Sequence, residues 1–446
     1  MRQTKNIPLV IVKAISCILF VSGSFNPAIT NATEYFVAIN GNDAQPGTKS
    51  APVRTIQKGI SLMRSGYGNE KGDTLYLREG TYGETINSNN LTIPTGTSWA
   101  NAPVIAAYHG ERVILRPNGA WTIINVADPG IHYVIFERLI LDGTDLNREN
   151  GVGISVGNGT NHVRFLNMEV KDCPALSVLL SLRPSEKQSG ISEGGVFNEF
   201  IGGKYHGAGK NRGDILSKNH GSTMRSYNFY ITSDNNLFDG LEVYDATHYG
   251  YHIYNAVDPR PSHNIVRNNR IYHNSIENPS TSGILLASGK GNMAYNNLVY
   301  NSPGHGLQVG NGSIDAKVYN NTIYNNKYSG IGIGKGTGGA TNTIVTNNIS
   351  YKNGANYEDI GISTKESTNM MDGTDPLFID PSNLDFHPQS NNPKSSAIDN
   401  GVTLAEVTMD FDGNARTQEA PYDIGAFEFN PSTVGLPRNF RILTVH

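Results

Sequence analysis

Short stretches of alternating apolar and polar residues, separated by turns rich in Asn and Gly, recur along most of the chain. Alternation with a period of two predicts β-strands that bury one face. In the clearest repeat, a short strand, an Asn pair and a second short strand ending in Tyr follow one another. Its copies are Ile265–Tyr272, Met293–Tyr300, Lys317–Tyr324 and Ile344–Tyr351. The pattern predicts an all-β protein, with one short amphipathic helix at Ile56–Met63.

The residue that follows each Asn pair, or its equivalent in weaker copies, gives the period of the repeat. These residues are Ile140, Glu169, Lys204, Glu242, Arg270, Leu298, Thr322 and Ile349, at intervals of 29, 35, 38, 28, 28, 24 and 27. Such a period, built from short strands, is typical of solenoid coils. Leucine-rich repeats share the period, but their leucine framework is absent. We therefore expect a parallel β-helix, in which each strand pairs with its equivalent in the next coil.

The Asn pairs then form two columns along the solenoid. The first column is Asn268, Asn296, Asn320 and Asn347, and the second is Asn269, Asn297, Asn321 and Asn348. Asn tolerates the left-handed backbone region, which suits a bend between strands. Inward-pointing amides can hydrogen-bond from coil to coil as a ladder. An aromatic stack is expected from Tyr272, Tyr300, Tyr324 and Tyr351, and we interpret all of these columns as structural.

Composition narrows the class of protein. The 446 residues include 39 acidic and 35 basic side chains, for a formal charge of -4, which argues against a nucleic-acid-binding protein. With 22 Tyr and 15 Phe the chain has ample apolar surface for a core, which argues against disorder.

The N-terminus has the arrangement of a secretory signal peptide. Arg2 and Lys5 precede an apolar stretch, residues 7–21, and small residues follow up to Ala32. We therefore expect residues 1–32 to be a signal peptide and the protein to be secreted or periplasmic; the alternative is a buried N-terminal helix. No later segment has about 18 consecutive apolar residues, so no membrane span is expected. Removal of Cys17 would leave Cys173 without a disulfide partner, as a core or turn residue.

Both ends of the predicted solenoid resemble a known superfamily. The opening segments Tyr35–Asp43 and Gly72–Tyr82 and the closing segments Asp375–Asp380, Ser396–Asp399 and Asp423–Glu428 resemble secreted right-handed parallel β-helix proteins related to pectate lyases. The resemblance implies one right-handed parallel β-helix domain over residues 33–430, with an N-terminal cap helix, a closing segment and a tail at 431–446. We expect a monomer. The same scaffold carries lyases, hydrolases, epimerases and non-enzymatic proteins, so the fold alone does not fix the chemistry.

The two longest repeat intervals place a candidate site. They contain extra segments at residues 183–195 and 219–235, and basic, His and Tyr residues are concentrated within and just after them. Solenoids commonly carry function where their regular coils are interrupted. A cationic, aromatic groove suits an acidic polysaccharide, because it attracts carboxylates and stacks on sugar faces. The candidate substrate-binding residues are Lys204, His206, Arg212, His220, Arg225 and Arg260.

Strand alternation selects the candidate catalytic residues. It places Leu216, His252, Leu285, Gln308 and Gly332 outward in one column, and Lys218, Tyr254, Ala287, Gly310 and Gly334 in the next. Ile215, Tyr251, Ile284, Leu307 and Ile331 share an inward column. Functional side chains are thus confined to two coils. The candidates are Lys218, His252, Tyr254 and His248, and the competing interpretation is an ordinary solvated face.

These residue types suit β-elimination on a uronic-acid-containing polysaccharide. Lys218 or His252 would take the proton at C5 and Tyr254 would act as the acid, while Arg212, Arg260 and Lys204 would contact the carboxylate. The resemblance to pectate lyases, which use Arg or Lys as base, favours Lys218. One alternative is a glycoside hydrolase using two of Asp214, Asp234, Asp239 and Asp258. The others are a uronan C5-epimerase and a non-catalytic carbohydrate-binding or surface β-helix.

The column Glu169, Lys204, Glu242 and Arg270 alternates in charge. The simpler interpretation is a surface charge ladder, stabilised by roughly 0.2–1 kcal/mol per pair. The functional alternative is a Ca2+ site built from Glu169 and Glu242 with Asp172 and Asp245. The resemblance implies calcium because many lyases of this fold use it. Ca2+ is therefore an open expectation, and we expect no other cofactor.

Overall fold

The computed structural model describes residues 32–63, 72–181, 194–210, 226–256, 261–336, 338–389, 397–416 and 421–429. All of them belong to one compact unit that begins at Ala32. Within these ranges, no helix has the length and apolar character needed to cross a membrane.

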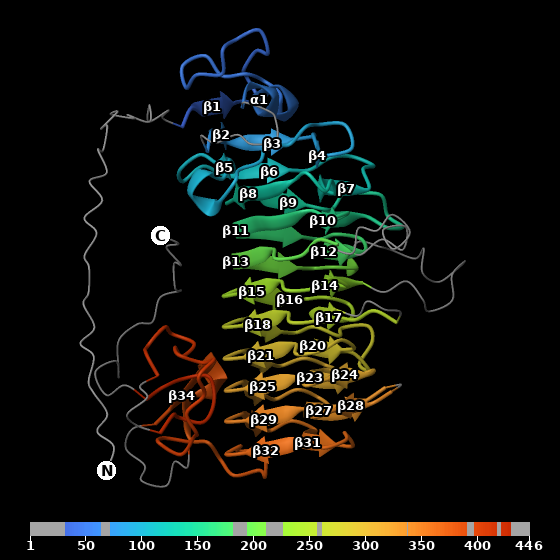
Figure 1. Ribbon diagram of the computed structural model, residues 1–446, viewed down its shortest axis with the longest axis vertical. Helices are drawn as coiled ribbons and strands as arrows, with labels where there is room; N and C mark the ends of the chain where they lie inside the picture. The colour runs from blue at the N-terminus through green and yellow to red at the C-terminus, as the bar shows by residue number, and fades with distance from the viewer. Residues whose placement is uncertain are drawn as a thin grey trace, which may run out of the picture. The chain divides into compact units, whose positions relative to one another are not determined.

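One turn of the solenoid consists of three short strands that lie in three columns. In a typical coil, β18 (Ile265–Arg267) belongs to the first column, β19 (Arg270–Tyr272) to the second and β20 (Ser282–Ala287) to the third. Each strand pairs in parallel with its equivalent in the next coil, as β19 does with β22 (Leu298–Tyr300). Figure 1 shows these columns as stacked rows of arrows. The predicted parallel β-helix is confirmed.

The first and second columns form one 20-stranded sheet, because β11 (Asn161–Lys171) and β13 (Glu199–His206) run through both. The other strands of the first column are β1 (Glu34–Val37), β2 (Thr74–Leu77), β5 (Val104–Ala107), β8 (His132–Glu137), β15 (Leu237–Asp239), β21 (Met293–Tyr295), β25 (Lys317–Tyr319), β29 (Ile344–Thr346) and β32 (Lys365–Ser367). The other strands of the second column are β3 (Gly80–Tyr82), β6 (Val113–Leu115), β9 (Ile140–Asp142), β16 (Glu242–Tyr244), β26 (Thr322–Tyr324) and β30 (Ile349–Tyr351).

The third column is a separate 10-stranded sheet. Its other strands are β4 (Ile86–Asn87), β7 (Thr122–Val126), β10 (Val152–Gly157), β12 (Leu176–Ser181), β14 (Tyr227–Ile231), β17 (Tyr251–Ile253), β23 (His305–Gly310), β27 (Ser329–Lys335) and β31 (Ala355–Asp359). Two small pairs complete the strands: parallel β24 (Ser313–Ile314) and β28 (Ala340–Thr341), and antiparallel β33 (Phe378–Asp380) and β34 (Asp385–Pro388).

The short helix α1 (Ile56–Leu62) closes the N-terminal end of the core. The Thr55 side chain caps it by accepting a hydrogen bond from the Lys58 N–H, and Ile56 and Ile60 are fully buried in the core cluster. The helix predicted at Ile56–Met63 is confirmed to within one residue. The described 3-10 turns are η1 (Trp99–Asn101) and η4 (Pro381–Asn383).

The interior is filled by side chains that stack from coil to coil. Phe136, Phe165, Phe200 and Phe238 are register partners, with successive ring centroids 5.3, 4.8 and 5.4 Å apart. These distances are close to the strand spacing of about 4.8 Å, so each ring lies on the ring of the next coil. Cys173 is fully buried in the same core, as expected for a structural residue.

The Asn pairs form the bend between the first and second columns. Asn268, Asn296, Asn320 and Asn347 all have positive φ, from 48° to 58°. The second Asn of each pair is buried: Asn297 Oδ1 accepts both the backbone N–H of Asn269, at 3.1 Å, and its Nδ2, at 3.0 Å. The same contacts continue through Asn321 and Asn348. The predicted ladder is confirmed, because the inward amides satisfy backbone N–H groups that the sharp bend leaves unpaired.

The structure contains two further ladders that the sequence pattern did not reveal. One lies before the first strand column and joins Asn198, Asn236, Asn264 and Asn292. The other lies after the second column and joins Asn274, Ser302, Asn326 and Asn353. Ser302 interrupts the second of these, so the residue type alone does not mark the column.

The residues that follow the Asn pairs, or their equivalents, pair from coil to coil in the predicted register from Ile140 to Ile349. In the third column, the predicted pairing of His252 with Leu285, Gln308 and Gly332 is also correct. The predicted register of Ile215, Leu216 and Lys218 with Tyr251, His252 and Tyr254 is wrong. On the previous coil the partners of β17 are Phe229, Tyr230 and Ile231 of β14.

The expected column position of Gly334 is wrong as well. A bulge follows Val309, and Gly310 pairs with Lys335. A β-bulge inserts one residue and shifts every later side chain by one position, which alternation alone cannot foresee.

After β32 the chain turns back and packs on the outer face of the first two columns. Phe378, Phe386, Ile424 and Phe427 form a cluster with Leu298, Tyr300 and Ile349. The predicted tyrosine stack is therefore only partly correct. Tyr272 and Tyr300 stack at 5.2 Å and 12°, whereas Phe386 contacts both Tyr300 and Tyr324, at 5.5 and 5.2 Å. We call residues 375–429 the closing segment; Figure 1 shows it in red beside the lower coils.

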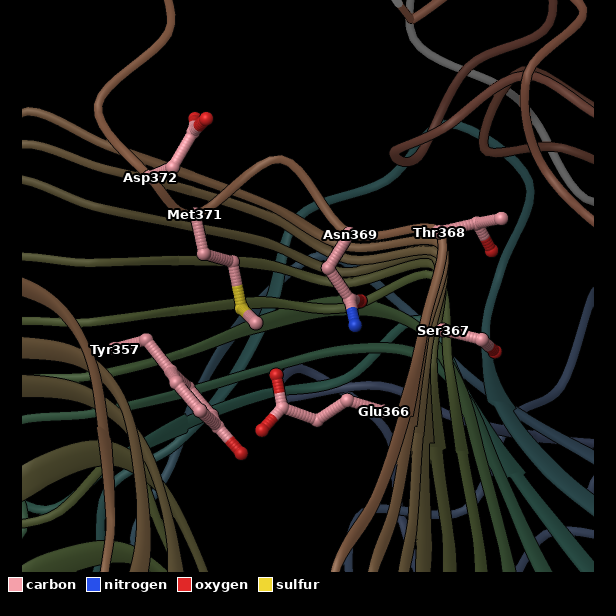
Figure 2. A pocket seen from close by; sticks show the side chains of 7 residues that line it. All are labelled: Tyr357, Glu366, Ser367, Thr368, Asn369, Met371 and Asp372. Atoms are coloured by element: carbon pink, nitrogen blue, oxygen red, sulfur yellow. The ribbon is translucent and has the colours of Figure 1, made fainter.

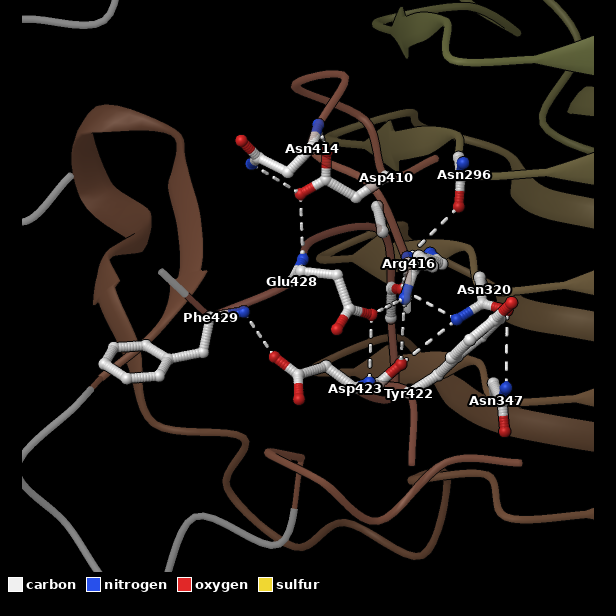
Figure 3. Close-up of polar contacts among 12 residues, drawn as sticks. Asn296, Asn320, Asn347, Asp410, Asn414, Arg416, Tyr422, Asp423, Glu428 and Phe429 are labelled. Atoms are coloured by element: carbon white, nitrogen blue, oxygen red, sulfur yellow. Dashed lines mark hydrogen bonds and ion pairs between the residues drawn. The ribbon is translucent and has the colours of Figure 1, made fainter. Parts of the chain in front are cut away.

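A buried arginine fixes the closing segment to the Asn bend (Figure 3). Arg416 is 3% exposed; its guanidinium forms an ion pair with Glu428 and donates to Asn296 Oδ1 at 3.2 Å and to the Gly425 carbonyl at 2.9 Å. Asn320 Nδ2 donates to the carbonyl of Asp423 at 3.1 Å. The outward amides of the first Asn column therefore bind the closing segment.

The C-terminal end of the coil stack has a cavity of about 440 Å3 (Figure 2). Tyr357 of β31 and Glu366 of β32 face it from opposite sides, with Asn369 and Met371 along its rim. None of the predicted site residues lies there.

Candidate functional site

His252 lies at the centre of an aromatic cluster on the outer face of the third column. It is the middle residue of β17, between the register partners Tyr230 of β14 and Leu285 of β20. Alternation points Tyr251 and Ile253 into the core, where both are fully buried, and His252 outward. The outward direction of His252 is thus as predicted.

Four tyrosine rings pack around the His252 imidazole. Tyr249 and Tyr230 stack on it, with centroids at 4.6 and 5.2 Å, and Tyr227 and Tyr254 approach at a tilt, at 4.6 and 5.3 Å. His252 is consequently 3% exposed, whereas Tyr230, Tyr249 and Tyr254 are half-buried. The cluster thus has a buried imidazole as its floor and phenol rings as its rim, an arrangement able to stack on sugar faces and to exchange protons.

His248 lies at the edge of the cluster, just before β17. Its ring centroid is 6.3 Å from that of Tyr227, and its Nδ1 is 3.2 Å from Thr247 Oγ1. Of the four candidate catalytic residues, the structure brings His252, Tyr254 and His248 together. Lys218 lies outside the described residues, as do Arg212, His220, Arg225 and Arg260.

Sequence reasoning did not select Tyr227, Tyr230 and Tyr249 as site residues. The usable signal was the alternation in Phe-Tyr-Ile at 229–231 of β14, which places Tyr230 outward between two core residues; alternation alone does not place Tyr227 on that face.

Two family models match parts of the chain. A model for a right-handed β-helix region matches residues 208–372, and a model for a family of unknown function matches residues 39–98. The solved structure of pectate lyase Pel9A superimposes with a TM-score of 0.60 over 90% of this chain and 98% of that one, at 16% identity. The chain has the right-handed parallel β-helix fold of the pectate-lyase-like superfamily. The resemblance inferred from the ends of the chain is confirmed.

Other relatives of this β-helix protein agree with that assignment. A rhamnogalacturonan lyase superimposes with a TM-score of 0.55 over 78% of this chain and 91% of that one, at 14% identity. Pectate lyase PEL9 of Emericella nidulans is 37% identical over 98 residues, which span 22% of this chain and 21% of that protein.

Lys204 and His206 of this β-helix lie on a different face from His252. They point outward from β13 in the second column, where Lys204 pairs with Glu242 at 3.2 Å and His206 contacts Glu169 at 3.5 Å. The hydrogen bond from His206 lowers the pKa of Glu169, although burial opposes it. The Lys204–Glu242 ion pair agrees with the charge-ladder interpretation, whereas Glu169 contacts His206, which lies outside the predicted column. Lys204 and His206 belong to the second column and the His252 cluster to the third, contrary to the prediction that they share one groove.

The four carboxylates considered for calcium contact basic or histidine side chains in the structure. Besides Glu169 and Glu242, Asp172 pairs with Lys171 at 3.2 Å and Asp245 binds Lys210 and His273, both at 2.5 Å. Three of the four carboxylates pair with a lysine, and Glu169 contacts His206. In the described part of the chain, no group of three or more His, Cys, Asp or Glu side chains is arranged to hold a metal ion.

Proposed function

We propose that this protein is a polysaccharide lyase, which cleaves a uronic-acid-containing polysaccharide by β-elimination at the His252 cluster. The observation that carries the proposal is the imidazole of His252 enclosed by Tyr227, Tyr230, Tyr249 and Tyr254 on one outward face. Tyr227 and Tyr230 of the cluster lie in the long 38-residue interval, and His252 lies on the coil that follows it.

The proposed reaction needs a base, an acid and a contact to the substrate carboxylate. A base takes the C5 proton, the C4–O4 bond breaks as the C4=C5 double bond forms, and the acid gives a proton to the leaving oxygen. His252 and Lys218 are the two candidates for the base. Tyr254, two residues after His252 on the same face, is the proposed acid. Arg212 and Arg260 are the proposed carboxylate contacts.

The positions of the carboxylates favour a lyase over a hydrolase. A glycoside hydrolase needs two carboxyl groups beside the scissile bond. Asp239 forms an ion pair with Arg267 at 2.7 Å in the first column, away from His252, and Asp234 accepts the Ser262 N–H at 2.7 Å. Both are committed to structural contacts; Asp214 and Asp258 lie outside the described residues.

Similarity to known proteins supports the same class of activity. The local match to a pectate lyase and the fold shared with a pectate lyase and a rhamnogalacturonan lyase make acidic plant-type polysaccharides the first substrates to test. We further propose, from the signal-like N-terminus, that the protein is secreted or periplasmic and acts on an extracellular polymer.

The test is to incubate the purified protein with polygalacturonate, rhamnogalacturonan and alginate while recording the ultraviolet absorbance of unsaturated uronate. We expect absorbance to rise with at least one polymer. New reducing ends without absorbance would indicate a hydrolase, and neither signal would indicate a binding protein. Repeating the assay with a chelator tests the calcium expectation.

A further inference from the structure

A second groove lies between the second strand column and the closing segment. It has a volume of about 690 Å3, and it is lined by Glu242, Arg270, Tyr272, Tyr300, Ile379, Asp380, Asn383, Leu384, Asp385, His387 and Phe427. Its strand side belongs to β16, β19 and β22, and its other side to β33, η4 and β34. It is separate from the third column, which carries His252.

The closing segment presents two exposed apolar side chains to this groove. Ile379 and Leu384 are each 38% exposed. Leu384 also has a φ of 64°, in the left-handed region that Gly or Asn normally occupies. A bulky residue held in that region costs folding free energy, and such strain is concentrated at functional sites.

The opposite side of the groove offers hydrogen-bonding groups. The rings of Tyr272 and Tyr300 stack face to face, at 5.2 Å and 12°. Tyr300 is 3% exposed and its hydroxyl bonds to Arg270, whereas Tyr272 is half-buried. The Arg270 guanidinium lies over the Phe411 ring at 4.9 Å, which holds it in place along the strands.

The charges of the lining residues exclude a strongly anionic ligand. The carboxylates are Glu242, Asp380 and Asp385, against the cation Arg270 and the imidazole of His387. Glu242 pairs with Lys204 at 3.2 Å, and His387 bridges Asp385, at 2.5 Å, and Asp412, at 2.9 Å. A polyuronate would meet repulsion here, whereas uncharged sugar hydroxyls can donate to carboxylates and accept from Arg and Tyr.

We propose that this groove binds a neutral oligosaccharide, the uncharged part of a polysaccharide, independently of the His252 cluster. The apolar C–H faces of the sugar rings would pack on Ile379 and Leu384, and their hydroxyls would bond to the polar side. The volume suits a ligand of a few sugar rings.

The experiment is affinity electrophoresis and calorimetry with arabinan, galactan, xylan and xyloglucan, and with polygalacturonate as the anionic comparison. We expect binding to at least one neutral polymer. Leu384→Gly should weaken it about tenfold, from the loss of buried apolar area, while the fold keeps or gains stability because Gly suits the left-handed backbone. Ile379→Ala should act in the same direction.

Two controls make the result decisive. Ile360→Ala removes a side chain that is 69% exposed and does not line the groove, so it should bind like the parent protein. His252→Ala should keep neutral-polymer binding even if lyase activity is lost, which separates this proposal from the proposed function. Failure to bind any neutral polymer, or unchanged binding by Leu384→Gly, would overturn the proposal.

Discussion

His252 occupies an outward strand position yet is almost fully buried, because four tyrosine rings pack around it. An imidazole is a common general acid or base, and the proposed function assigns this role to His252. His252 and Tyr254 therefore belong to the packed cluster and are also the residues proposed to transfer protons.

Replacing either key side chain should remove activity and preserve the fold. We expect His252→Ala and Tyr254→Phe to lower kcat/KM by about 10²–10⁴-fold, the usual contribution of a positioned acid or base. Circular dichroism should show an unchanged β spectrum. The matched controls are His109→Ala and Tyr328→Phe, exposed residues away from the cluster. Full activity in both cluster variants would rule out this site.

Part of this cluster was predictable from sequence and part was not. Alternation fixed the outward direction of His252, because the flanking Tyr251 and Ile253 had to enter the core. The neighbour on the previous coil was mispredicted, because a 38-residue interval contains two candidate strands, one around Ile215 and one around Phe229. Only the hydrogen-bonded register shows that Phe229 and Tyr230 are the partners.

At the scale of elements, the bend between the first two columns depends on the buried Asn ladder. Asn297 Oδ1 accepts two hydrogen bonds from Asn269, and its Nδ2 donates to the Val266 carbonyl at 2.8 Å. We expect Asn297→Ala to lower the free energy of unfolding by about 1–3 kcal/mol, because a buried N–H loses its acceptor. Chemical denaturation measures this change. Asn89→Ala, at an exposed turn, should change it by less than about 0.5 kcal/mol.

The attachment of the closing segment should depend on pH. Burial raises the pKa of Glu428 to about 7, and the Arg416 ion pair opposes the shift. The folded state thus holds the Glu428 proton more tightly than the unfolded state. Protonation of Glu428 therefore stabilises the fold fully below pH 4.5, the ordinary pKa, and this stabilisation is lost as pH rises through about 7.

The measurement is the free energy of unfolding, from chemical denaturation, at pH 5 and pH 8. Between these pH values it should fall by up to roughly 3 kcal/mol more in the parent protein than in Glu428→Gln, whose side chain cannot titrate but still accepts from Arg416. Equal losses in the two proteins would contradict the assignment of this pH dependence to Glu428.

The closing segment illustrates what element-level reasoning could not foresee. Its sequence motifs indicated a terminal segment, but its packing on the outer face depends on contacts such as Arg416 with Asn296, 120 residues apart. The outward Asn residues looked purely conformational in the sequence. The structure gives them a second role as acceptors and donors for this segment.

At the scale of the whole molecule, the repeat was sufficient to predict the solenoid. The period and the Asn pairs are local patterns that recur along the solenoid, so an error in one coil does not alter the predicted architecture. The functional face was harder to predict, because the coil before β17 lies in the irregular 38-residue interval. Proximity in the sequence groups Lys204 and His206 with His252. In the solenoid, however, the first two lie on the second column and His252 lies on the third.

The most direct test of the account is mass spectrometry of the products formed from polygalacturonate, rhamnogalacturonan or alginate in ¹⁸O-labelled water. β-Elimination breaks the C4–O4 bond without water, so we predict one unsaturated product per cleavage and no ¹⁸O at the new ends. The same digestion with His252→Ala should form products about 10²–10⁴-fold more slowly. Incorporation of one ¹⁸O per cleavage, or cleavage at the parent rate in His252→Ala, would contradict a lyase acting at the His252 cluster.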